Sequence, residues 1–170
     1  PALSEQLAKL GDVYVSDAFG TVHRAHASTE GVTHFIAQSA AGFLVKKEMD
    51  YFGRVLSNPE RPLVAILGGA KVSDKVLVVD NLINLVDTLV IGGGMAYTFM
   101  KAKGMEIGKS LLDEAGIEVA KNAMAKAEAK GVKLLLPVDF TVADDFSNDA
   151  NTQTVPASGI PADWEGLDIG

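Results

Sequence analysis

The chain has 170 residues, of which 48% are hydrophobic and 22% are charged, proportions typical of a globular protein rather than a disordered or fibrous one. It contains no cysteine, which excludes disulfides, cysteine-ligated metals and a cysteine nucleophile, and it favours a cytoplasmic location. The net charge of −7 argues against a general nucleic-acid binder, and the apolar runs are too short to span a membrane.

The first part of the chain alternates between short regular and irregular segments. Leucines at helical spacing predict a helix over residues 3–10, and an apolar triplet predicts a strand over residues 13–15. Residues 16–38 show no sustained period and predict a loop, so that strand has no evident partner. A second helix is predicted over residues 43–56 and is closed by Pro59 and Pro62.

A regular alternation of strands and helices follows. Strands are predicted over residues 63–67 and 88–91, each followed by glycines and then by a helix, over residues 71–85 and 95–103. Uninterrupted apolar strands are typical of a parallel sheet covered on both sides. The sequence therefore predicts an α/β fold with a Rossmann-like parallel sheet and helices on both faces.

The last third continues this pattern less clearly. Ser110 and Asp113 resemble a capping box for a helix ending at Lys130, and strands are predicted over residues 133–136 and 138–143. Residues 144–156 predict a polar surface loop rather than a calcium loop, and residues 159–170 are turn-rich without a closing strand. We expect an incomplete domain, cut at both ends.

The segment LVAILGGAKVSDK is the first candidate for chemistry. A glycine after a strand lets a ligand approach the backbone, and a helix N-terminus attracts anions. Lys71 and Lys75 are four residues apart, which predicts that they share one helix face near Gly69. Cations in a first helical turn oppose the helix dipole, so an anionic ligand is one explanation. A tight turn with solvated lysines is the other.

Two further segments carry candidates. TLVIGGGMAYTF repeats the strand-to-glycine pattern, and the two glycine turns are expected to line one crevice at the carboxyl edge of the sheet. DAFGTVHRAHAS holds His23 and Arg24, where a guanidinium suits a phosphate or carboxylate. Close packing of helix on strand is the alternative for TLVIGGGMAYTF, and it is favoured for that segment taken alone. A loop held by histidine hydrogen bonds explains DAFGTVHRAHAS equally well. No metal site is predicted. His34 and Trp164 are interpreted as packing residues.

Together these segments resemble the phosphoglycerate kinase family. The matching stretches include DVYVSDAFGTVHRAHAS, LVAILGGAKVSDK, VIGGGMAYTFMKAKGMEIGKSLLD and GIPADWEGLDIG. The resemblance implies two Rossmann-like domains joined by a helix, and phosphoryl transfer from 1,3-bisphosphoglycerate to Mg·ADP, giving 3-phosphoglycerate and ATP. It also implies three parts: residues 1–42 as the end of the N-terminal substrate domain, 43–58 as the interdomain helix, and 59–170 as the first half of the nucleotide-binding domain.

The resemblance also implies roles for single residues. Lys71 and Lys75 would contact the nucleotide phosphates and the transferred group, and Arg24 with His23 would contact 3-phosphoglycerate. The remaining nucleotide contacts would come from Gly69, Gly93, Gly94, Leu111, Gly166 and Leu167. Mg2+ would arrive on the nucleotide, and its protein ligand would lie in a part of the family's sequence that this chain lacks.

The resemblance leaves the activity of this chain open. Family members are expected to be monomeric and much longer, so we expect this chain to be inactive alone and to self-associate through an open sheet edge. A nucleotide- or phosphate-binding module without transfer activity is the alternative function.

Overall fold

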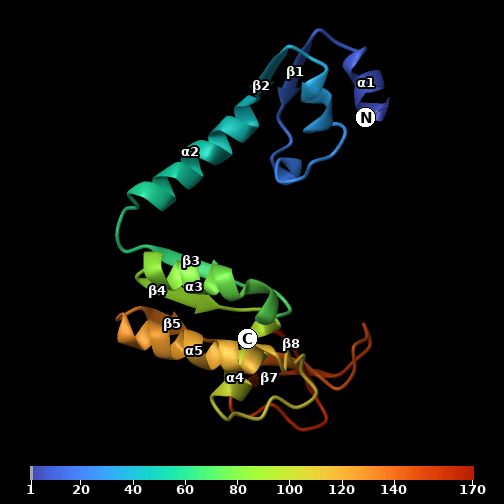
Figure 1. Cartoon of the computed structure of the whole chain (residues 1–170). Helices are drawn as coiled ribbons and strands as arrows, with labels where there is room; N and C mark the ends of the chain where they lie inside the picture. Colours follow the sequence, from blue (N-terminus) through green and yellow to red (C-terminus); the bar gives the residue numbers. More distant parts are fainter. Residues whose placement is uncertain (1) are drawn as a thin grey trace. The chain divides into compact units, whose positions relative to one another are not determined.

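The computed structural model describes residues 2–170, which divide into two compact units after Pro59. Figure 1 shows the elements of each unit. The first unit contains three helical turns or helices before its long helix, and two short strands. In chain order these elements are α1 (Ala2–Ala8), β1 (Val13–Ser16), η1 (Phe19–Thr21), η2 (Gly31–His34), β2 (Gln38–Ala41) and α2 (Phe43–Ser57), where η denotes a 3-10 helix.

The first unit contains a strand that the sequence did not predict. β2 pairs in parallel with β1, with Val13 opposite Gln38. The expectation that the first strand lacks a partner is therefore wrong, because the Gln-Ser-Ala-Ala strand has no apolar pattern to reveal it. The predicted helix after it is confirmed as α2. Its first amides, those of Leu44 and Val45, donate to the carboxylate of Asp17 at 2.7 and 3.0 Å.

The second unit contains two sheets and three α-helices. The parallel sheet has the strand order β3-β4-β5, and the antiparallel sheet has the order β7-β6-β8. The elements are β3 (Val64–Leu67), η3 (Ser73–Lys75), α3 (Val76–Leu85), β4 (Thr88–Ile91), α4 (Met95–Ala102), α5 (Gly116–Ala129), β5 (Lys133–Leu135), β6 (Asp139–Ala143), β7 (Thr152–Pro156) and β8 (Glu165–Ile169).

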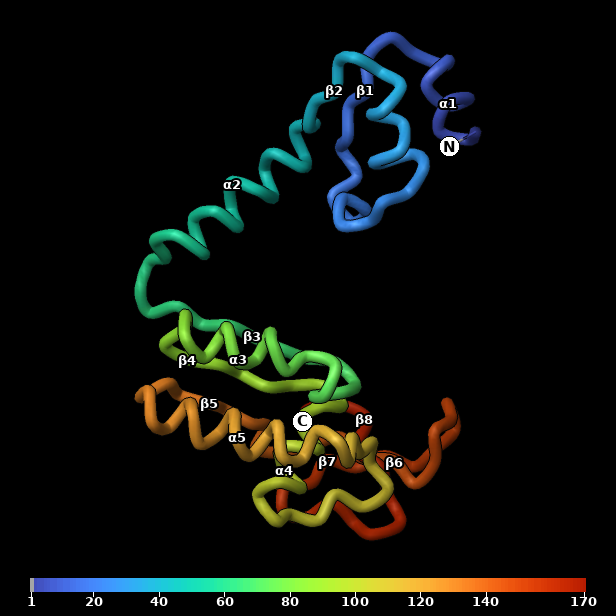
Figure 2. Tube along the Cα trace, in the orientation of Figure 1, coloured from blue at the N-terminus to red at the C-terminus, as the bar shows by residue number. Residues whose placement is uncertain are grey.

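The predicted α/β class with a parallel sheet is confirmed, but within residues 2–170 helices cover one face of that sheet. Leu89 and Ile91 face the helices and are fully buried, whereas Ile66 on the other face is 80% exposed. Both crossovers step in one direction, from β3 to β4 to β5. Right-handed crossovers of that kind place their helices on the same side. The tube in Figure 2 shows α3 and α5 running beside these strands.

The core of the second unit is centred on α4. Every residue from Met95 to Met100 is buried, because this helix is enclosed by α5 and by the antiparallel sheet. The ring centroids of Tyr97 in α4 and Phe140 in β6 are 4.8 Å apart, which joins the helix to the antiparallel sheet. One core cluster contains buried residues of both sheets, such as Leu89 and Phe140. Burial of a side chain such as Phe99 contributes about 1.5–3 kcal/mol.

The antiparallel sheet replaces two regions predicted to be irregular. Residues 152–156 form β7 rather than a surface loop, and residues 165–169 form β8 rather than a turn-rich end. β7 is mostly exposed, so it lacks the apolar alternation that would have revealed it. Pairing with the buried strand β6 holds both strands in place. No helix in residues 2–170 is both long and apolar enough to cross a membrane.

Candidate functional site

The two glycine turns meet at the carboxyl edge of the parallel sheet. Leu67, the last residue of β3, pairs with Ile91, the last residue of β4, and each strand runs directly into its glycines. Gly93 has a φ of 64°, and a Cβ atom there would lie 3.0 Å from the backbone nitrogen of Gly69. The two turns therefore pack backbone against backbone, which no larger residue at position 93 allows without a shift.

Hydrogen bonds fix the second turn to the first. The amide of Met95, at the start of α4, donates to the carbonyl of Gly69 at 2.7 Å. The next two amides, of Ala96 and Tyr97, donate to the carbonyls of Gly93 and Gly94. The Met95 amide thus holds the two turns together, and the Ala96 and Tyr97 amides are used within the second turn. The exposed backbone of Gly93 and the two lysines are the groups left to meet a ligand.

The lysines do not share a helix face, contrary to the prediction. Lys71 lies in the loop before η3, Lys75 is the last residue of η3, and α3 begins only at Val76. The cause is a tertiary contact, because the amide of Ser73 donates to the carboxylate of Asp113 at 2.8 Å and draws the segment into a tight turn. We call residues 71–75 the lysine turn.

Both lysines of this turn are free of ion pairs. The salt bridges of residues 2–170 include neither Lys71 nor Lys75. The Lys75 ammonium lies over Gly69, so close that a Cβ atom on that glycine would be 2.8 Å from Nζ. Lys71 is exposed two residues further on. The edge of the sheet therefore combines exposed glycine backbone with two uncompensated positive charges.

The loop before α5 extends this edge. Leu111 packs on Gly94, where a Cβ atom would lie 2.9 Å from its Cδ2. Its neighbour Ser110 accepts a hydrogen bond at 2.8 Å from the amide of Gly166 in β8, and Leu167 beside it is 42% exposed. Because α5 begins at Gly116, Ser110 and Asp113 are not a capping box, contrary to the prediction.

Two ionisable groups beside the glycine turns have shifted pKa values. Burial raises the pKa of Tyr97 to about 12, and the nearby charge of Asp168 acts in the same direction. The Tyr97 hydroxyl lies against Gly166, where a Cβ atom would be 2.2 Å from it. The pKa of Asp113 is lowered, chiefly by the hydrogen bond from the Ser73 amide. Asp113 is therefore held as a carboxylate by backbone amides of the lysine turn, chiefly that of Ser73.

His23 and Arg24 lie in the first unit, both exposed. The loop that carries them is held by Thr29, whose hydroxyl donates to the Arg24 carbonyl at 2.7 Å. His34 is exposed beside Glu30, so its interpretation as a packing residue is wrong. Trp164 is half-buried against the core, as predicted. No group of three or more potential metal ligands occurs in the described part of the chain.

The structure thus brings together six of the predicted residues in the second unit: Gly69, Lys75, Gly93, Gly94, Leu111 and Gly166. The sequence prediction assigned Ser110 and Asp113 to a helix cap rather than to this site, and it gave no role here to Thr98 or Tyr97. Asp113 lies 40 residues from Ser73, and Ser110 lies 56 residues from Gly166, so no local spacing could have paired them.

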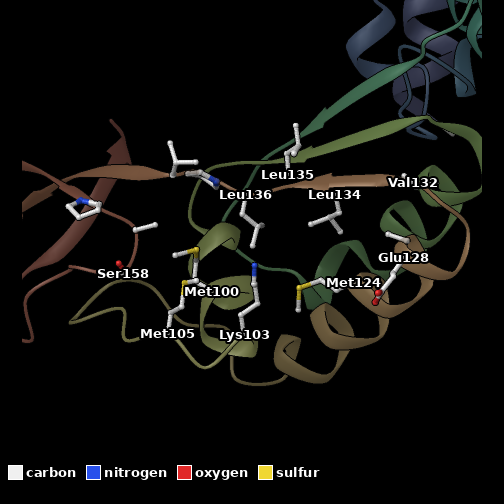
Figure 3. Close-up of a pocket in the computed structure, with 15 residues that line it drawn as sticks. Met100, Lys103, Met105, Met124, Glu128, Val132, Leu134, Leu135, Leu136 and Ser158 are labelled. Atoms are coloured by element: carbon white, nitrogen blue, oxygen red, sulfur yellow. The ribbon is translucent and has the colours of Figure 1, made fainter.

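A cavity of about 630 Å³ lies in the second unit but apart from these residues. Figure 3 shows Lys103 directed into it, among Met100, Met105 and Met124. Its other walls come from the end of α5, from residues 132–138 and from residues 156–158. None of the predicted site residues lines this cavity, so it is not the candidate site.

Two solved structures share this arrangement of elements. The solved structure of phosphoglycerate kinase from Coxiella burnetii superposes with a TM-score of 0.80 at 43% identity, and covers 99% of this chain and 43% of its own. The enzyme from Pyrococcus horikoshii OT3 superposes with a TM-score of 0.76 at 27% identity, covering 98% of this chain and 44% of its own.

Sequence relatives agree. The chain is 57% identical to phosphoglycerate kinase of Acidobacterium capsulatum and 55% identical to "Phosphoglycerate kinase 3, cytosolic" of Arabidopsis thaliana. Each match covers 100% of this chain and 42% of the relative, so the chain spans less than half of their length. The family model described as phosphoglycerate kinase matches residues 1–170. The chain therefore belongs to the phosphoglycerate kinase family.

Proposed function

We propose that the glycine turns, the lysine turn and Leu111 form the nucleotide side of a phosphoryl-transfer site. The whole protein would transfer a phosphoryl group from 1,3-bisphosphoglycerate to Mg·ADP, giving 3-phosphoglycerate and ATP. The observation that carries this proposal is the pair of lysines without ion pairs, Lys71 and Lys75, beside two glycine turns at the carboxyl edge of a parallel sheet.

The chemistry needs few protein groups. An oxygen of the ADP β-phosphate forms a bond to the transferred phosphorus, the bond from phosphorus to the acyl oxygen breaks, and 3-phosphoglycerate leaves as a carboxylate. The transition state is loose and rich in negative charge, so positioning and positive charge supply most of the catalysis. Lys71 and Lys75 offer that charge, and Gly69 and Gly93 let phosphate oxygens approach the backbone. Mg2+ arrives with the nucleotide as part of the substrate.

We propose that the first unit supplies contacts to the other substrate. Arg24 carries a planar guanidinium that can bind a carboxylate or phosphate through two parallel hydrogen bonds, and His23 lies next to it. The Thr29 hydroxyl fixes the backbone at Arg24, so the loop is ordered before any ligand binds. This order reduces the entropy lost on binding.

The three-part division of the chain is proposed with the function. Residues 1–42 would end a substrate domain, 43–58 would form the interdomain helix, and 59–170 would begin the nucleotide domain. The compact units divide after Pro59, at the end of the proposed helix segment. A cytoplasmic location is proposed from the cysteine-free composition and from the cytosolic Arabidopsis relative.

Calorimetric titration of the chain with Mg·ADP tests the nucleotide site. We expect saturable binding that weakens about tenfold in each of Lys71→Ala and Lys75→Ala, since one charge-assisted contact of about 1.4 kcal/mol corresponds to that factor. Lys47→Ala removes an exposed lysine in α2 and should leave the affinity unchanged. Equal weakening in Lys47→Ala would mean that net charge, rather than this site, governs binding.

A coupled assay of ATP formation separates the two candidate functions. Binding of Mg·ADP without ATP formation by a longer family member carrying these residues would favour the binding module. Loss of ATP formation in Lys75→Ala of that protein, with 3-phosphoglycerate binding retained, would support transfer at the lysine turn.

A further inference from the structure

Two polar side chains anchor the loop that carries Leu111, one on each side of it. Ser110 is 6% exposed and accepts the amide hydrogen of Gly166 at 2.8 Å. Asp113 accepts the amide hydrogen of Ser73 at 2.8 Å, and its own amide donates to Thr98 Oγ1 at 3.1 Å. Thr98 is fully buried in α4. We call residues 110–113 the anchor loop.

The anchor loop connects three parts of the candidate site. Through Asp113 it reaches the lysine turn, through Leu111 it reaches the glycine turn at Gly94, and through Ser110 it reaches Gly166. A Cβ atom on Gly116 would lie 2.6 Å from the Asp113 carboxylate, so that carboxylate packs closely against Gly116 at the start of α5. A shift of this loop would therefore move several predicted nucleotide contacts together.

We propose that Ser110 and Asp113 are positioning residues that hold the anchor loop as one rigid clamp between the lysine turn and Gly166. The clamp fixes Lys75 and Leu111 in the geometry that binds nucleotide. This inference rests on the proposed function and deepens it. It assigns the alignment of Lys75 and Leu111, which would contact the phosphates and the base, to two side chains that would not themselves contact the nucleotide.

Removing the side chain of Ser110 or Asp113 leaves a backbone amide without its hydrogen-bond acceptor, and the free energy lost is that of an unpaired amide. Without the Asp113 carboxylate, the Ser73 amide at the start of η3 loses a charged acceptor, which also interacts favourably with the positive end of that turn. Asn at position 113 keeps the shape and one acceptor oxygen. It should therefore preserve part of the geometry that Ala destroys.

The test is Mg·ADP titration of the 170-residue chain and three variants, Asp113→Ala, Asp113→Asn and Ser110→Ala, at a temperature where each is folded. We expect Asp113→Ala and Ser110→Ala to weaken binding about tenfold or more, and Asp113→Asn to recover part of the loss. Unchanged affinity in both alanine variants overturns the clamp.

Asp87→Ala is the matched control. Its carboxylate accepts the amide hydrogen of Leu63 at 2.6 Å, a contact of the same kind at the opposite end of β3. A purely structural role predicts that Asp87→Ala and Asp113→Ala lower the unfolding temperature and change Mg·ADP affinity alike. The clamp predicts that only Asp113→Ala changes the affinity. Equal affinity losses in the two variants therefore count against the proposal.

Amide hydrogen exchange separates failure of the clamp from failure of the proposed function. The Gly166 amide donates to Ser110 and not to Asp113. If the loop acts as one rigid clamp, Asp113→Ala should nevertheless speed hydrogen exchange at this amide by about tenfold. Ser110→Ala should do the same at the Ser73 amide. If the unmodified chain does not bind Mg·ADP, the nucleotide site fails, and exchange alone decides the clamp. The clamp is overturned if the Gly166 amide keeps its protection in Asp113→Ala and the Ser73 amide keeps its protection in Ser110→Ala.

Discussion

Gly93 shows how one residue fixes the shape of the candidate site. Its φ of 64° lies in the left-handed region, and its Cα faces the backbone of Gly69. A side chain there meets two separate costs, that of the left-handed conformation and that of pushing two backbones apart. The glycine is therefore required by packing as well as by backbone conformation.

A strained φ alone costs about 1–3 kcal/mol. We expect Gly93→Ala to lower the free energy of unfolding of the second unit by more than that. Gly131→Ala is the matched control, because Gly131 has a φ of 70° and a Cβ atom there would meet nothing within 4 Å. Denaturant unfolding of both variants measures the difference. Equal losses of stability in Gly93→Ala and Gly131→Ala would mean that the two glycine turns can move apart at no cost in free energy.

Tyr97 offers a pH-dependent signal of its burial. Its pKa in the folded chain, about 12, lies above the ordinary value of 10.0, so folding favours the protonated hydroxyl. This contribution to stability is complete below pH 10 and is lost as the pH rises from 10 toward 12. Ultraviolet titration should show a tyrosinate step near pH 12 that disappears in Tyr97→Phe. A step near pH 12 that persists in Tyr97→Phe would belong to another tyrosine and would contradict the raised pKa of Tyr97.

At the scale of elements, apolar runs bounded by glycine or proline were sufficient for prediction. β3, β4, α2 and α4 were predicted to within about two residues, because their apolar residues follow the period of the element and their ends carry Gly or Pro. The meeting of the two glycine turns followed from the parallel order of β3 and β4. The bounds of these elements depend on local sequence, whereas the meeting of the turns also requires the parallel pairing of β3 with β4.

Elements set by distant partners could not be predicted. The helix predicted from residue 71 begins at Val76, because Asp113 captures the Ser73 amide. The polar strand β7 exists because it pairs with β6. For the same reason the sequence supplied the glycines and lysines of the candidate site but not Ser110 or Asp113, whose roles depend on residues far along the chain.

At the scale of the molecule, the uncovered face of the parallel sheet predicts self-association. Ile66 is 80% exposed, Val64 is 50% exposed and Leu135 is 42% exposed, and the outer edges of β3 and β5 pair with no strand in the described residues. Apolar faces and free strand edges both favour contact between copies. We expect light scattering to show a mass that rises with concentration.

A substitution on that face should reduce the association. Ile66→Thr keeps a β-branched residue in β3 while removing apolar surface, and the mass should fall toward that of one chain. Phe146→Ser is the control, because Phe146 is 81% exposed outside the sheet. A single-chain mass for the unmodified protein at every concentration would contradict the prediction.

The only tryptophan of the chain has a position with a practical consequence. The Trp164 carbonyl accepts the amide hydrogen of Lys109 at 2.8 Å, directly before Ser110, and Trp164 stands two residues before Gly166. Trp164 is therefore part of the same short segment, residues 164–166, that the anchor loop contacts through Ser110 and Gly166. Intrinsic fluorescence of the native chain can thus report a change in that stretch optically, without a label and without a second tryptophan to obscure the signal.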